Sequence, residues 1–100
     1  MPVAGVRHIL VKTNVEANRL RDRIAKGADF AKLAKEFSLC PSGKKAGGDL
    51  GEVKPGQMVR QFDKIVFKGE LIKIHGPVKT QFGFHLIQVL FFKIVETSIL

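Results

Sequence analysis

The segment 84–92 is the part of this sequence that most constrains the fold, because its residues alternate between two largely apolar sets. One set is His85, Ile87, Val89 and Phe91, and the other is Phe84, Leu86, Gln88 and Leu90. Such alternation is typical of a β-strand. The turn-forming residues Gln81-Phe82-Gly83 separate it from a second short strand predicted at 77–80, closely enough for a hairpin.

Upstream of this hairpin, apolar spacing and turn residues predict helices and further strands. Thr13 and Glu16 have the spacing of a capping box, Gly27 is a good helix stop, and Asp29 can cap the next helix. The predicted elements are a strand at 6–12, a helix carrying Ala17, Leu20 and Ile24, a helix carrying Phe30, Leu33, Ala34 and Phe37, an irregular stretch at 38–48, a strand at 49–53, a helix at 59–67 and, after a turn at 76–77, the two strands named above. This order indicates an α+β sandwich with a mostly antiparallel sheet.

A chain of 100 residues has the length of a single domain. Residues 1–100 contain no repeat or linker that would divide them, and the core of the domain is expected at about 6–92. Cys40 is the only cysteine, so an intrachain disulfide cannot form. The first residues do not resemble a signal peptide, and no apolar stretch approaches the roughly 18 residues of a membrane span. We expect a reduced, cytoplasmic monomer without membrane contact.

The charge is strongly basic, with 17 Lys and Arg against 9 Asp and Glu and a formal net charge of +8. A basic balance raises the expectation of acidic partners, including nucleic acid. The basic residues are dispersed, however, and the longest run is Lys44-Lys45. A solvated basic surface is the simpler interpretation, and it leaves weak nucleic-acid binding open.

Two histidines on predicted strands could meet if those strands pair. His8 lies near the start of the first strand and His85 near the start of the last, each with apolar neighbours on its face. Each could instead be a buried, hydrogen-bonded core histidine. Cys40 could be a small buried hydrophobe, a nucleophile beside a histidine, or a ligand with both histidines. No pair has zinc-finger spacing, so no metal is expected.

Three apolar residues stand out from the expected core. Met58 follows a Pro-Gly turn, Phe82 lies in a turn, and Phe62 is on a predicted helix. Together they could line a small open apolar pocket. Ordinary packing is the competing interpretation, and it is the better one for Phe62 taken alone.

Several stretches resemble the parvulin family of peptidyl-prolyl cis/trans isomerases. Residues 6–11 (VRHILV) resemble the opening strand of that family, and residues 28–38 (ADFAKLAKEFS) resemble its second helix. The most characteristic stretches are CPSG at 40–43 followed by GGDLG at 47–51, and GPVKTQFGFHLI at 76–87. The resemblance covers about 6–92 and is strongest to minimal single-domain bacterial parvulins.

The resemblance implies a parvulin/FKBP-like fold, in which four helices surround a four-stranded antiparallel sheet and one short helix follows Cys40. It also implies a site. His8 and His85 resemble the paired histidines of the family, Thr80 the hydroxyl that joins their network, and Cys40 a position usually held by Cys or Asp. The residues that resemble the wall around the substrate proline are Leu50, Met58, Phe62 and Phe82.

The implied function is noncovalent rotation of X–Pro bonds in unfolded or partly folded proteins, with no cofactor. Relatives specific for phosphoserine or phosphothreonine have a long basic loop after the first strand. Here only Thr13-Asn14-Val15 separates Lys12 from the first helix, so an apolar residue before proline is expected instead. Two other functions stay open: a basic nucleic-acid-binding module on this fold, and a holdase-like chaperone domain.

Overall fold

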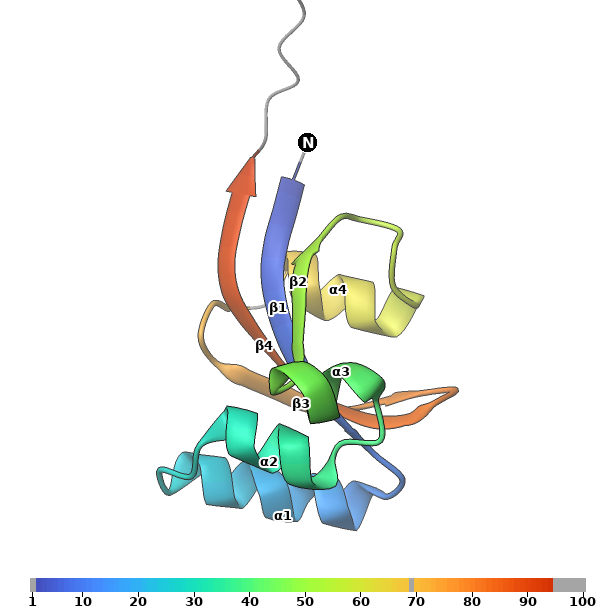
Figure 1. The fold of residues 1–100 in the computed structure, drawn as a ribbon. Coiled ribbons are helices and arrows are strands. Elements are labelled where there is room, and N and C mark those ends of the chain that lie inside the picture. Colours follow the sequence, from blue (N-terminus) through green and yellow to red (C-terminus); the bar gives the residue numbers. More distant parts are fainter. Residues whose placement is uncertain (1, 69, 95–100) are drawn as a thin grey trace, which may run out of the picture.

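The computed structural model describes residues 2–68 and 70–94. Figure 1 shows its elements. In chain order they are β1 (Pro2–Val11), α1 (Asn14–Ala25), α2 (Phe30–Phe37), α3 (Pro41–Ala46), β2 (Asp49–Val53), α4 (Arg60–Lys68), β3 (Ile74–Thr80) and β4 (Gly83–Ile94). The predicted order of elements is confirmed. The helices α1, α2 and α4 have 12, 8 and 9 residues. The six-residue α3 is the short helix expected after Cys40.

The strands form one antiparallel sheet in the order β2-β1-β4-β3. The long strands β1 and β4 therefore lie in its centre, and the register sets Leu10 opposite His85 and His8 opposite Ile87. The hairpin predicted at the end of the chain is β3–β4, closed by the Thr80–Gly83 pair.

The prediction of a turn at Gly76-Pro77 is wrong, because both residues lie inside β3. The register between β3 and β4 shifts between His75 and Val78, so the two residues bulge out of the ladder. Proline cannot donate a ladder hydrogen bond, and it is tolerated in a strand at an edge or a bulge. β3 is an edge strand, and Pro77 lies at its bulge, so the proline is tolerated there for both reasons.

The predicted helix starts are confirmed by their caps. The Thr13 hydroxyl accepts a hydrogen bond from the Glu16 N–H at 3.1 Å, and the Asp29 carboxylate accepts one from the Lys32 N–H at 3.1 Å. Each cap satisfies one of the amides that the first helical turn leaves unpaired.

The sheet separates two apolar clusters. Ile9, Val11 and Leu86 pack on one face against α1 and α2, and Val6, Ile87 and Val89 pack on the other against α4. The predicted alternation is confirmed for β1 and for β4 up to Val89. Beyond Val89 it is wrong, because the register between β1 and β4 shifts where Val6 pairs with Val89 and Gly5 with Phe91. Phe92, and not Phe91, therefore lies on the α4 face, where its ring contacts that of Phe67.

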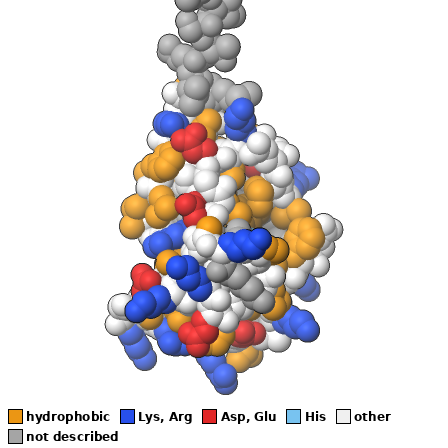
Figure 2. All heavy atoms as spheres, viewed as in Figure 1, with side chains coloured by type: hydrophobic (Ala, Val, Ile, Leu, Met, Phe, Trp, Pro, Cys, Tyr) orange, Lys and Arg blue, Asp and Glu red, His pale blue; other side chains and the backbone are white. Residues whose placement is uncertain are grey.

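The charges on the surface are distributed as the sequence predicts. Figure 2 shows Lys and Arg side chains scattered among apolar and acidic ones on the visible face, without a single basic block. Within residues 2–68 and 70–94, no helix has the length and apolar character to cross a membrane.

Substitution of Gly48 tests how the segment before β2 is fixed to β1. Gly48 has φ +87°, its carbonyl accepts the His8 N–H at 2.9 Å, and an added Cβ would overlap the backbone carbonyl of His8. Gly51 is a matched control, because its φ is +70° and an added Cβ would meet open space. We expect Gly51→Ala to lower the free energy of unfolding by about 1–2 kcal/mol and Gly48→Ala by about 1–3 kcal/mol more, measured by denaturant unfolding. Equal losses would contradict this packing.

Candidate active site

Two buried imidazoles from the central strands form the centre of the site. His8 on β1 and His85 on β4 are diagonal neighbours on one face of the sheet, and their Nδ1 atoms lie 3.1 Å apart in a hydrogen bond. Each side chain is only 3% exposed. The meeting of the two histidines, which the sequence left conditional on strand pairing, is confirmed.

A hydroxyl extends this pair toward the β3–β4 turn. Thr80 Oγ lies 2.7 Å from His85 Nε2 and also accepts the Phe82 N–H at 3.1 Å. Thr80 is buried at the end of β3. The network therefore runs from β1 through β4 to the turn that follows β3.

One proton lies between the two imidazoles, and two arrangements of protons satisfy the network. In the first, His85 Nδ1–H donates to His8 and the Thr80 hydroxyl donates to His85 Nε2. In the second, His8 Nδ1–H donates to His85, and His85 Nε2–H donates to Thr80. Both rings are neutral in either case. His8 Nε2 is buried and has no hydrogen-bond partner among the described residues.

The surroundings favour neutral rings. Burial, and secondarily the nearby His85, lower the pKa of His8 from 6.5 to about 4. Burial also lowers the pKa of His85. A charged imidazole loses its hydration when it is buried, so the uncharged form is preferred. At neutral pH the pair can accept and donate hydrogen bonds but carries no charge.

Phe62 packs against both imidazoles from α4. Its ring centroid lies 5.4 Å from that of His8 and 5.5 Å from that of His85, with interplanar angles of 80° and 85°. The ring is fully buried. Leu50 and Met58 are half-buried and pack against the same apolar cluster. Contact between a ligand and Phe62 therefore requires the side chains that cover it to move.

The remaining predicted residues, Phe82 and Cys40, lie near the ends of elements. Phe82 is 59% exposed in the β3–β4 turn, so the structure does not bury it with Phe62. Cys40 is half-buried directly before α3, which packs on α2, β1 and β2. Within the described chain, no three His, Cys, Asp or Glu side chains form a metal-binding group.

Ser38 is a positioning residue that the sequence analysis did not single out. Its buried hydroxyl accepts the Leu10 N–H at 3.1 Å and the Cys40 N–H at 3.4 Å. The next residue, Leu39, donates its N–H to the Leu10 carbonyl at 2.8 Å. These bonds attach the segment before Cys40 to the strand that carries His8. The available signal was a hydroxyl residue directly after a helix and shortly before a proline.

Comparison with known proteins identifies related sequences. Residues 4–91 match the PPIC-type PPIASE domain. The chain is 42% identical to the foldase protein PrsA of Geobacillus kaustophilus over 88 residues, which are 88% of this chain and 31% of that protein. It is 43% identical to a parvulin-like PPIase of Rickettsia felis, covering 85% of this chain and 31% of that protein. The chain thus spans about a third of the length of these curated relatives.

Solved structures give the same result for the fold. PrsA from Bacillus anthracis superposes with a TM-score of 0.90 and 32% identity, over 96% of this chain and 44% of that one. NmPin, the parvulin of Nitrosopumilus maritimus, superposes with a TM-score of 0.80 and 34% identity, over 89% of this chain and 96% of that one. The chain belongs to the parvulin, or PPIC-type, family of peptidyl-prolyl cis/trans isomerase domains.

Proposed function

We propose that this chain accelerates the rotation of X–Pro bonds in unfolded or partly folded proteins without forming a covalent bond to them. The observation that carries the proposal is the neutral, hydrogen-bonded histidine pair packed on Phe62. Leu50 and Met58 pack against the apolar cluster to which Phe62 belongs. An uncharged polar centre at an apolar wall suits an imide, which has a carbonyl dipole and an aliphatic ring.

The chemistry requires only selective binding of a twisted imide. The barrier to rotation is about 18–20 kcal/mol because the C–N bond has partial double-bond character. The resonance form responsible is charge-separated, so water favours it, and an apolar pocket weakens that support. A site that binds the twisted state more tightly than the planar states lowers the barrier. No bond breaks, so no cofactor is needed.

The position of each residue suggests its role in substrate binding. Leu50 and Met58, which are half-buried, would hold the prolyl ring. Phe82, exposed in its turn, would close over the ring from the side of β3 and β4. Met58 can adapt because its side chain is long and unbranched. Phe62 would contact the substrate after its cover moves, and in the resting state it orients the imidazoles.

The hydrogen-bonded network would keep the site in one shape and one protonation state. His8, His85 and Thr80 are joined by bonds of 3.1 Å and 2.7 Å. We assign Cys40 a polar role near the imide, since a nucleophile would need a thiolate and this reaction needs none.

The proposed substrates have no phosphate before proline. β1 ends at Val11 and α1 begins at Asn14, so no long basic loop lies between them. An apolar residue before proline fits such a site better. Proteins that have not finished folding expose these bonds, and the PrsA relative is itself named a foldase protein.

An isomerisation assay without protease tests this function. Uncatalysed exchange of an X–Pro bond takes tens to hundreds of seconds at 25 °C. We expect low micromolar protein to accelerate relaxation of an Ala-Leu-Pro-Phe peptide with no metal or nucleotide added, as followed by NMR exchange. A phosphoserine-Pro peptide should relax more slowly under the same conditions.

Substitution of Met58, with Leu71 as a control, tests whether the proposed apolar wall is needed for isomerisation. Met58→Ala should reduce the isomerisation rate while the protein stays folded, because Met58 is only partly buried in the wall. Leu71→Ala is the control, since Leu71 is 50% exposed and lies outside that cluster. Folded wild-type protein without acceleration would refute the proposed function, and equal rates for both variants would refute the assigned wall.

Substitutions of Cys40 separate its two alternative roles. Covalent catalysis needs the thiol, whereas a polar role needs only a polar or negative group near the imide. We therefore expect Cys40→Asp to keep substantial activity and Cys40→Ala to be less active, at a matched folded fraction. An inactive Cys40→Asp variant, together with a peptide adduct trapped on the wild-type thiol, would support covalent attack instead.

A further inference from the structure

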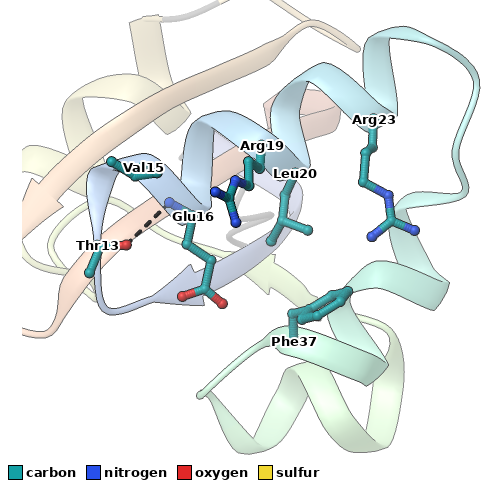
Figure 3. A pocket seen from close by; sticks show the side chains of 7 residues that line it. All are labelled: Thr13, Val15, Glu16, Arg19, Leu20, Arg23 and Phe37. Atoms are coloured by element: carbon teal, nitrogen blue, oxygen red, sulfur yellow. Dashed lines mark hydrogen bonds between the residues drawn. The ribbon is translucent and has the colours of Figure 1, made fainter.

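A hollow of about 450 Å³ lies between α1 and the end of α2 (Figure 3). Its lining runs along α1 from the N-cap Thr13 to Arg23 in the last turn, and it includes Phe37 at the end of α2. Its lining residues are Thr13, Val15, Glu16, Arg19, Leu20, Arg23 and Phe37. Leu20 belongs to the apolar cluster on the α1 and α2 face of the sheet, whereas Phe62 belongs to the cluster on the opposite face. The hollow is therefore separate from the candidate active site.

The inner surface of the hollow is apolar. Leu20 and Phe37 form part of it, and Phe37 packs at the edge of the cluster under α1 and α2. Val15 also lines the hollow and is 63% exposed. Binding of one large apolar side chain would remove this apolar surface from water, which favours association.

The rim is basic. Arg19 and Arg23 are one helical turn apart on α1, and neither forms an ion pair in the part of the chain that the structure describes. The Arg23 guanidinium carbon lies 5.7 Å from the centre of the Phe37 ring. Figure 3 shows Leu20 and Arg23 projecting from α1 toward Phe37, with the carboxylate of Glu16 farther along the same side of α1. Two guanidinium groups beside one carboxylate leave a net positive rim over an apolar floor.

We propose that this hollow is a second docking site for client polypeptide, and that it binds a large apolar side chain flanked by an acidic residue. The apolar side chain would enter between Val15 and Phe37, and the carboxylate would pair with Arg19 and Arg23. A polynucleotide fits less well, because it carries a phosphate at every residue and Glu16 would repel them. A peptide can place its one carboxylate away from Glu16.

The proposal is tested with a peptide that has no proline, so that the isomerase site is not engaged. The probe is acetyl-Gly-Leu-Phe-Asp-Gly-amide, titrated into the ¹⁵N-labelled chain of 100 residues. We expect amide shift changes concentrated at 13–23 and 36–39. Arg19→Gln/Arg23→Gln should weaken binding about twofold to thirtyfold, the range for two exposed charge contacts. Glu16→Gln should strengthen it, and Val15→Thr should weaken it because a methyl group is replaced by a hydroxyl.

Matched controls separate docking from general attraction to a basic protein. Lys32→Gln/Lys35→Gln removes the same charge from exposed positions of α2 outside the hollow, and it should leave binding unchanged. A Gly-Leu-Phe-Lys-Gly peptide should bind more weakly than the aspartate peptide. Equal losses in the two double variants, shift changes centred elsewhere, or stronger binding of a short single-stranded DNA at the same residues would each overturn the proposal. All of these readouts are independent of isomerase activity.

Discussion

The antiparallel pairing of β1 with β4 is the constraint on which the rest of the molecule depends. It brings residues from the two ends of the chain together, and its register makes His8 and His85 diagonal neighbours. It also divides the apolar side chains between two faces, so that α1 and α2 cover one and α4 covers the other. Without this pairing neither the histidine network nor the Phe62 contact could exist.

Burial of two imidazoles in one network has an energetic consequence. The pKa of His8 falls from 6.5 to about 4 because the charged form is desolvated. Between these values the folded chain binds fewer protons than the unfolded chain. His8 therefore does not reduce the free energy of unfolding above about pH 6.5. As the pH falls from 6.5 toward 4, the free energy of unfolding decreases. The same preference keeps the site uncharged where the proposed imide chemistry needs an uncharged environment.

Much of this arrangement could be predicted from local patterns. Alternation predicted the two faces of 84–89, and capping residues predicted the starts of α1 and α2. The faces of 90–92 could not be predicted, because they depend on a register shift between β1 and β4. The bulge at Gly76-Pro77 could not be predicted, because it depends on β3 being an edge strand. The complete burial of Phe62 and the role of Ser38 as a link to β1 also depend on tertiary contacts. The roles of Cys40, Leu50, Met58 and Phe82 stay predictions that activity measurements must decide.

The central claim is that an uncharged, hydrogen-bonded histidine pair organises the site. Its most direct test is a pH titration of the imidazole nitrogens by ¹⁵N NMR on the folded protein. We predict one protonated nitrogen on each of His8 and His85 at neutral pH, and a His8 ring that stays neutral until the pH approaches about 4. A His8 ring that takes up its second proton near pH 6.5, or one charged at neutral pH, would contradict the account.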